Sequence, residues 1–279
     1  MVYTVTASKF NDPYDSLLKY DLDNIASLIK STANVDFLSF LRKMVSSNNL
    51  PPVLKFFSKD IIDKACIDLE NADLQDRDKI NKVLQTKAFN FVNIVKTLAP
   101  LISSVIRNAV HNACFSERID SLTMWSHYAN NHKGFVLGYP KNNLSFEIMS
   151  SQKSMLYPVI YSNKRYDSDD LFAWAVYNSF GISMAMPDKL ANIKTAINKS
   201  SDWSYEYEWR LINPIPVTKE DGAIPVKLVP TEIYYGEEIS KDDKMLLHNI
   251  AIKKNMAEYD MFIDYASSDY ALIYRKAII

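Results

Sequence analysis

The sequence predicts an α+β protein with a mixed, mainly antiparallel sheet, a large helical insertion and flanking helices. Three observations predict this class. Short segments rich in β-branched and aromatic residues are scattered along the chain, apolar residues at helical spacing fill residues 23–112, and helical blocks separate most of the strand segments. We therefore expect a single α+β domain over residues 1–279, with a helical insertion at about 23–112.

The first half of the chain begins with a strand and continues with helices. Residues 2–6 (VYTVT) are β-branched or aromatic, which favours a strand. The Asn-Asp-Pro sequence at 11–13 then favours a turn. In the helical insertion, the apolar residues expected on buried helix faces are Ile25, Leu28, Ile29, Ile94, Leu98, Leu101 and Val105.

The second half alternates between short helices and short strands. We expect a short helix over 121–130, because apolar and polar residues alternate there at helical spacing. The elements expected after it are strands over 134–139 and 158–161, helical spacing over 169–199 with a break near Pro187, strands over 206–212, 226–229 and 232–235, a helix over 241–255, and strands over 260–265 and 271–278.

Composition excludes several classes of protein. Lys and Arg total 32 and Asp and Glu total 33, so the net charge of −1 excludes a nucleic-acid binder held by bulk charge. With 5 glycines and no Gly-rich phosphate motif, the Rossmann and P-loop classes are excluded as well. Cys66 and Cys114 do not make a disulfide framework, and we find neither a signal peptide nor a membrane span. We expect a cytoplasmic protein with reduced thiols.

Two short segments in the first half carry polar groups beside aromatic residues. In F-N-D-P-Y, a turn could point the side chains of Asn11 and Asp12 into a cleft, or these residues could cap the following helix. In C-F-S, Cys114 could be a nucleophile with His111 as its base on one helix face. The alternative is that Cys114 is a buried structural cysteine.

A third segment, L-T-M-W-S-H-Y-A followed by H-K-G-F, holds several chemically active side chains. His127 could bind a ligand or transfer a proton. The alternative is an amphipathic helix in which Trp125 and Tyr128 belong to the core. The Cys and His spacings match no zinc pattern, and we expect no metal.

The fourth segment, W-S-Y-E-Y-E-W-R-L, combines two glutamates and an arginine. If it is a strand, Glu206, Glu208 and Arg210 lie on one face and the apolar residues on the other. The charged face is either a solvated surface with salt bridges or one wall of a cleft. In a cleft, Arg210 would hold one glutamate in its ionised form.

The ordered set of segments resembles a known family. F-N-D-P-Y, C-F-S, M-W-S-H-Y-A with H-K-G-F, W-S-Y-E-Y-E-W-R-L and a later P-T-E-I-Y-Y-G-E-E-I-S resemble the bacterial family catalogued as domain of unknown function 2971. The resemblance covers nearly the whole chain and is weakest in the helical insertion. This family looks distantly like ADP-ribosyltransferases, in which a split mixed sheet holds NAD and a late strand carries the catalytic glutamate.

This resemblance implies an enzyme that uses NAD as a substrate and modifies a protein or nucleic acid. By analogy Glu208 would hold the nicotinamide ribose hydroxyl, Glu206 would orient the acceptor, and His127 would complete the catalytic set. It also implies a toxin or a phage-defence setting. The residues expected to bind substrate are Asn11, Asp12, Trp125, Ser126, Tyr128, Trp203 and Arg210.

Two other functions stay open. The family usually has a strand of the L-Y-K-Y kind before F-N-D-P, and ADP-ribosyltransferases place an Arg or His on their first strand. Only nine residues precede Phe10, so we expect that strand to be missing. This favours a non-catalytic binding or regulatory module of a bacterial defence system. A hydrolase that uses Asp12, Cys114, His127 and His132 is a third possibility.

Overall fold

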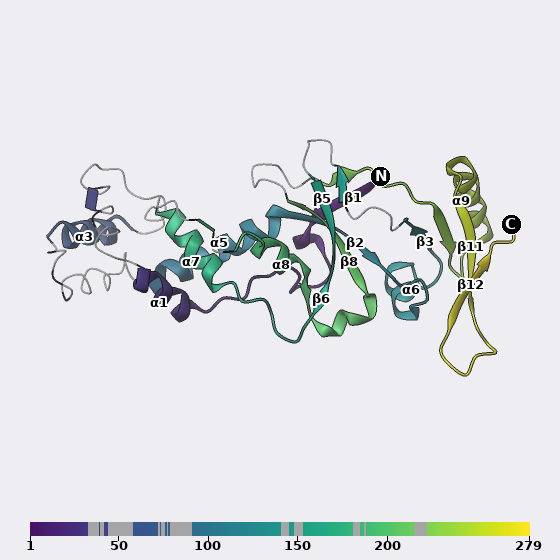
Figure 1. Ribbon diagram of the computed structural model, residues 1–279, viewed down its shortest axis with the longest axis horizontal. Coiled ribbons are helices and arrows are strands. Elements are labelled where there is room, and N and C mark those ends of the chain that lie inside the picture. The colour runs from purple at the N-terminus through teal and green to yellow at the C-terminus, as the bar shows by residue number, and fades with distance from the viewer. Residues whose placement is uncertain are drawn as a thin grey trace. The chain divides into compact units, whose positions relative to one another are not determined.

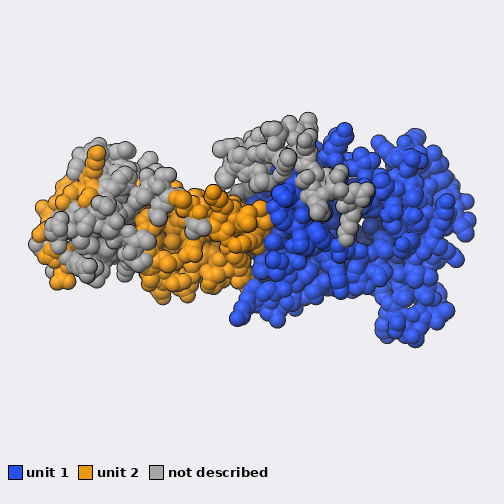
Figure 2. Space-filling view, in the orientation of Figure 1, with its two compact units in different colours: residues 1–15, 109–164, 197–279 blue, residues 16–108, 165–196 orange. Residues whose placement is uncertain are grey.

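The computed structural model describes residues 1–32, 39, 42–43, 58–71, 73, 76, 78, 91–140, 145–147, 153–180, 185–186, 188–214 and 222–279. The chain forms two compact units, which Figure 2 colours separately. Unit 1 comprises Met1–Asp15, Ala109–Lys164 and Ile197–Ile279, and unit 2 comprises Ser16–Asn108 and Arg165–Ala196. Helices and mostly antiparallel sheets confirm the predicted α+β class.

The larger sheet of unit 1 has the strand order β4-β5-β8-β2-β1-β9, and all of its neighbouring strands are antiparallel (Figure 1). Its strands are β1 (Val2–Thr6), β2 (Val110–Ser116), β4 (Ser145–Glu147), β5 (Lys153–Pro158), β8 (Glu208–Pro214) and β9 (Ile224–Val226). Strands from distant parts of the sequence are therefore neighbours, and this brings the N-terminal segment close to the segment around residue 208.

Side chains alternate between the two faces of this sheet, as in any β-strand. On one face, Ala113 and Leu211 pack with Val226 and Leu228 in an apolar cluster. The other face carries the alternate residues of β2 and β8. There Cys114 lies opposite Arg210 and Ser116 lies opposite Glu208, so this second face is polar and charged.

The second sheet of unit 1 has the order β12-β11-β10-β3. Its strands are β3 (Phe135–Gly138), β10 (Glu232–Tyr235), β11 (Ala257–Ile263) and β12 (Leu272–Lys276). Because β10 and β11 are parallel, the chain needs a crossover between them, and helix α9 (Lys241–Lys254) supplies it. Ser240 caps the start of α9 by accepting a hydrogen bond from the Asp243 backbone, and Asn255 ends it in the left-handed conformation.

Apolar residues cover both faces of the second sheet. Ala251 of α9 packs with Ile233 and Tyr235 on one face. On the other, helix α6 (Leu122–Tyr128) contributes Trp125, which packs in a cluster with Tyr234 and other buried residues of this sheet.

Shorter elements of unit 1 carry further residues that lie near the polar face, among them Lys199 and Glu206. β6 (Ile160–Tyr161) pairs in parallel with β7 (Asn198–Lys199). The 3-10 helix η1 (Ala7–Lys9) follows β1, and a second one, η3 (Ser201–Glu206), precedes β8. Between η3 and β8, Tyr207 has a left-handed backbone with φ of 46°. The chain therefore bends sharply between the two glutamates of the E-Y-E sequence.

Unit 2 is helical. Its elements are α1 (Leu22–Thr32), α3 (Lys59–Glu70), α5 (Phe91–Ala109), α7 (Asp169–Ser179) and α8 (Ala191–Ile197). The last residues of α5 and α8, Ala109 and Ile197, belong to unit 1. Helices α1 and α7 pack together, and the Asp169 carboxylate accepts hydrogen bonds from the Asp21 backbone at 2.7 Å and from Asn24 Nδ2 at 2.6 Å. The residues at the centre of its core include Ile25, Ile29, Ile94, Leu98, Phe172 and Val176.

Several element boundaries differ from the prediction. Helix α5 ends at Ala109 and β2 begins at Val110, so the helical insertion stops before residue 112. Leu101 and Val105 are exposed, unlike the other residues predicted for the buried faces of this helix. The helical spacing predicted up to residue 199 ends at Ile197, where β7 follows, and β8 begins at Glu208 instead of 206. The break predicted near Pro187 lies outside the described residues.

The strand predicted over residues 2–6 is confirmed: β1 precedes Phe10 and lies between β2 and β9 inside the larger sheet. Its sequence, VYTVT, contains neither Arg nor His. Within the parts of the chain that the structure describes, none of the helices has the length and apolar character that crossing a membrane would require.

Candidate functional site

Arg210 is the centre of a polar network on the charged face of the larger sheet. Its side chain is fully buried. Nη1 and Nη2 donate to the two carboxylate oxygens of Asp15 at 2.8 and 2.5 Å, and Nε donates to Glu208 Oε1 at 2.8 Å. The two-point contact with Asp15 fixes the guanidinium plane, because a charge-assisted bidentate pair is strong and directional.

Lys199 joins the two glutamates. Its Nζ donates to Glu206 Oε2 at 2.5 Å and to Glu208 Oε2 at 2.9 Å. The same ammonium lies 4.8 Å from the centre of the Trp203 ring, within range of a cation–π interaction. Glu208 is therefore held between two cations, whereas Glu206 is held by one.

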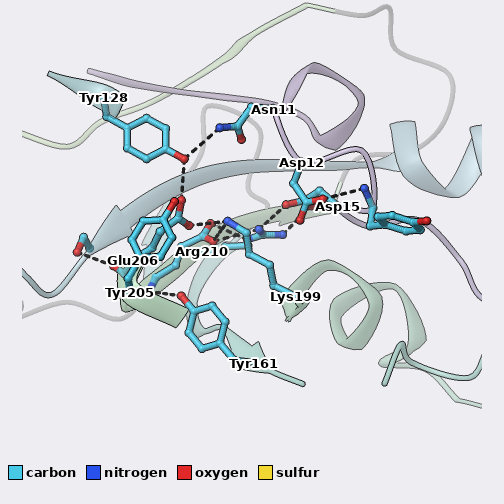
Figure 3. A network of polar contacts seen from close by, with 12 residues as sticks. Asn11, Asp12, Asp15, Tyr128, Tyr161, Lys199, Tyr205, Glu206 and Arg210 are labelled. Atoms are coloured by element: carbon cyan, nitrogen blue, oxygen red, sulfur yellow. Dashed lines mark hydrogen bonds and ion pairs between the residues drawn. The ribbon is translucent and has the colours of Figure 1, made fainter. Parts of the chain in front are cut away.

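The network reaches the surface through Tyr128. The Tyr128 hydroxyl donates to Glu206 Oε1 at 2.6 Å, and Asn11 Nδ2 donates to the Tyr128 hydroxyl at 3.1 Å. Both Tyr128 and Asn11 are exposed. Figure 3 shows the continuous series of contacts, which we call the Arg210 network; its members are Asn11, Asp15, Tyr128, Lys199, Glu206, Glu208 and Arg210.

The charges of the Arg210 network reinforce one another. Burial alone would raise the pKa of Glu208, but the charge and hydrogen bonds of Arg210, together with the charge of Lys199, outweigh it and lower the pKa to about 2. Burial would likewise lower the pKa values of Lys199 and Arg210, and the neighbouring carboxylates raise both above their ordinary values. Glu208 is therefore ionised, and the two cations protonated, throughout the neutral range.

Backbone contacts hold the bend between the two glutamates. Ser116 donates its hydroxyl to the Glu206 carbonyl at 2.6 Å, and the Glu117 backbone donates to the Tyr207 carbonyl at 3.2 Å. The Glu208 N–H donates to the Tyr161 hydroxyl at 2.8 Å. Because Tyr207 is left-handed, Glu206 and Glu208 approach Lys199 from different elements, and not from one strand face as the sequence predicts.

His127 lies beside the network without belonging to it. Its Nδ1 is 3.4 Å from the Tyr205 hydroxyl, and the two rings meet edge to face. Tyr205 in turn lies next to Trp203, with 6.1 Å between ring centres. An imidazole group beside Tyr128, an indole group beside Lys199 and the phenol of Tyr205 between them thus lie next to the network.

Three residues predicted to bind substrate have other contacts. Trp125 is buried in the core against the second sheet, where its indole N–H donates to the Ile119 carbonyl at 2.6 Å. Ser126 donates its hydroxyl to the Leu122 carbonyl at 3.0 Å. Asp12 Oδ1 accepts the backbone N–H of Tyr14 at 2.8 Å, so Asp12 caps a turn at 13–16 rather than a helix.

The proposed pairing of Cys114 with His111 depends on a helix that does not form. Both residues belong to β2, and three residues apart on a strand means opposite faces. Part of the Cys114 side chain is exposed. Loss of water around the thiol and the negative charge of Glu208 raise the pKa of Cys114 well above the ordinary thiol value. His132 contacts Ser126, so the four residues of the hydrolase hypothesis are not brought together.

Metal-ligand geometry is absent from the described residues: no group of three or more His, Cys, Asp or Glu side chains among them could hold an ion. Sequence reasoning missed two members of the Arg210 network, Asp15 and Lys199. Asp15 directly follows the F-N-D-P-Y segment, and this position was its only indication of a role in the site. Nothing in the sequence around Lys199 indicates such a role, because the pairing of β6 with β7 places it beside the glutamates.

Comparison with known proteins adds one finding. No curated protein and no solved structure matches the chain. Residues 124–211 contain Tyr128, Lys199, Glu206, Glu208 and Arg210, which are all but two members of the Arg210 network. Over these residues the chain matches the family described as "Protein of unknown function (DUF2971)", which confirms the family resemblance for this part of the sequence.

Proposed function

We propose that the Arg210 network is the active site of an enzyme that breaks a glycosidic bond in a nucleotide, in its specific form the transfer of ADP-ribose from NAD. One observation carries this proposal. Side chains from four separate segments, at 11–15, 128, 199 and 206–210, meet in one network that runs from a fully buried arginine to an exposed tyrosine and asparagine.

Stability alone is a poor reason for such a network. Removing charges from water costs free energy that ion pairs recover incompletely, and apolar residues of similar size frequently stabilise a core better. Clusters of ionisable groups with shifted pKa values are, in contrast, typical of active sites. The Arg210 network is a cluster of this kind, and it opens to solvent at one end.

The geometry favours Glu206 as the carboxylate that meets the substrate. Its Oε1 accepts a hydrogen bond from the hydroxyl of the half-exposed Tyr128, and a substrate hydroxyl could take the place of that phenol. A carboxylate there could hold a ribose hydroxyl and stabilise positive charge that develops on the sugar. Glu208 is held by Lys199 and Arg210 on both oxygens, so we assign it the role of positioning those two cations.

The surroundings of the exposed end suit a nucleotide. His127, Trp203 and Tyr205 offer aromatic surfaces next to Glu206, and aromatic rings stack well on nucleobases. Both cysteines, Cys66 and Cys114, are free thiols, which supports a reducing compartment such as the cytoplasm. A macromolecular acceptor and a toxin or phage-defence setting are parts of the proposal that come from the family resemblance.

The test is release of nicotinamide from NAD by the purified protein, measured together with the melting temperature. We expect turnover by the wild type, its loss in Glu206→Gln, and a lower rate in Tyr128→Phe. The matched control is Tyr234→Phe, because Tyr234 also donates its hydroxyl to a carboxylate, that of Glu232 at 2.9 Å, but in the second sheet. The control should turn over NAD like the wild type.

A second candidate is a non-catalytic binding module, and a specific observation favours it. All four carboxylate oxygens of Glu206 and Glu208 already accept hydrogen bonds within the protein. If NAD raises the melting temperature of the wild type but no nicotinamide is released, the binding module is correct. If NAD neither binds nor turns over, NAD is not the ligand and the proposed transfer reaction is wrong.

A further inference from the structure

Helix α9 has two apolar faces, and the chain covers one of them. On the inner face, Leu247 and Ala251 pack against the cluster that contains Ile233 and Tyr235. Among the described residues none covers the outer face, where the large apolar side chains are exposed by 44–62%: Met245, Leu246, Ile250 and Ile252. An apolar stripe of this kind on a helix commonly marks an interface.

The exposed side chains follow the spacing of a helix–helix contact. With about 3.6 residues per turn, Asp242, Asn249 and Lys253 lie nearly in line along α9. Met245 and Ile252 flank this line on one side, and Leu246 and Ile250 flank it on the other. The outer face therefore carries two apolar rows, one on each side of a central line that holds Asp242, Asn249 and Lys253.

Charge is distributed unevenly along this face. Asp242 lies in the first turn and Lys253 in the last turn. Within the described part of the chain, neither side chain has an ion pair or a side-chain hydrogen bond. A second α9 running in the opposite direction would place its Lys253 opposite Asp242 and its Asp242 opposite Lys253. A parallel arrangement would instead place like charges together, which is unfavourable.

We propose that the outer face of α9 binds the α9 of a second copy of this chain, antiparallel and around a two-fold axis near residues 247–248. In this arrangement Met245 of each copy lies opposite Ile252 of the other on one side of the contact, and Leu246 lies opposite Ile250 on the other side. The same patch then serves both copies, as a two-fold interface requires. The apolar side chains provide the affinity, and the two Asp242–Lys253 pairs set the direction of the helices.

The dimer is expected to be reversible. A 14-residue helix is roughly 21 Å long, and one helix pair of this length buries less surface than a typical stable interface. Sedimentation velocity of the full chain, across a roughly hundred-fold concentration range, should therefore show a monomer–dimer equilibrium. Leu246→Glu should leave only monomer, and Tyr270→Glu, at the fully exposed tip of the β11–β12 loop, should dimerise like the wild type.

Charge reversal tests the antiparallel direction. Asp242→Lys and Lys253→Asp each place like charges together at both ends of the helix pair, and each should raise the dimer Kd by roughly tenfold. An equal mixture of the two variants should form heterodimers as tightly as the wild type forms homodimers, because each copy supplies the charge that the other lacks. Circular dichroism checks that α9 stays folded in every variant.

Two results would overturn the proposal. A wild-type chain that stays monomeric at the highest concentration means that this face does not bind a second copy. A dimer that persists in Leu246→Glu, or a variant mixture that associates no better than its components, means that the copies meet through another surface or in another direction.

Discussion

The two sheets of unit 1 differ in the side chains that pack on them: paired charges on the larger sheet and aromatic rings on the second. On the polar face of the larger sheet, the fold buries three carboxylates and two cations and pairs them with one another. In the second sheet, Tyr259 stacks on Tyr234 with ring centres 4.9 Å apart, Tyr274 meets both rings edge to face at 5.2 and 5.4 Å, and Tyr234 packs in one cluster with Trp125. Removing one charged partner on the larger sheet leaves another charge buried and unpaired, whereas removing one ring from the second sheet costs only the contacts of that ring. This difference is consistent with our proposal that the active site lies on the larger sheet.

The largest effect should come from removing the central cation. Arg210→Met leaves Asp15 and Glu208 buried without their main partner, and we expect a loss of about 3–5 kcal/mol in the free energy of unfolding. Urea unfolding followed by circular dichroism measures this. A loss below about 1 kcal/mol would show that water or other groups replace the arginine easily, and that the two sheets do not differ as described.

Acid should destabilise the larger sheet by a slightly smaller amount. The pKa of Glu208 is lowered from 4.5 to about 2 on folding, so its ionised form stabilises the protein above pH 4.5. That contribution, roughly 3 kcal/mol at most, is lost as the pH falls from 4.5 towards 2. Unfolding measured between pH 6 and 3 should show the loss in the wild type and a much weaker dependence in Glu208→Gln.

Removing one ring from the three tyrosines of the second sheet should lower the free energy of unfolding by a smaller amount. Tyr259→Leu keeps an apolar side chain but removes ring contacts with Tyr234 and Tyr274, and we expect about 1 kcal/mol of destabilisation. Thermal unfolding would detect this change, and the loss should be the same at pH 6 and at pH 4. A loss as large as that of Arg210→Met would contradict the division between the two sheets.

The smallest effect on stability should come from Tyr128→Phe. The exposed hydroxyl gives up one hydrogen bond to Glu206, which is worth about 1 kcal/mol or less at a site open to solvent. The same change should have a large effect on nicotinamide release. Measuring unfolding and turnover on one sample separates the two roles, and a variant with unchanged turnover would remove Tyr128 from the site.

Most helices and strands could be predicted because their signals are local. The alternation in β1 and β10, and the helical spacing in α9, each come from a few neighbouring residues. The wrong boundaries occur where a tertiary contact decides the conformation. His111 and Cys114 read as a continuation of α5, but pairing with β8 makes them part of a strand.

The candidate site could be predicted in part. Polar segments rich in aromatic residues predict Asn11, Tyr128, Glu206, Glu208 and Arg210, and the structure brings these residues together. Trp125 and Ser126 came from the same kind of segment, yet their side chains point to the core and to their own helix. Composition cannot separate these cases, because the direction of a side chain on α6 depends on what the helix packs against.

The left-handed residue between the two glutamates also has an effect on how the chain tolerates change. Because pairing with β2 and β5 fixes the register of β8, a residue inserted into or deleted from the E-Y-E sequence would leave Arg210 on its face and move Glu206 away from Lys199. Substitution by a β-branched residue at Tyr207 would strain the same bend. The length of this tripeptide therefore decides whether both glutamates reach Lys199, and it is under tighter restraint than the identity of its middle side chain.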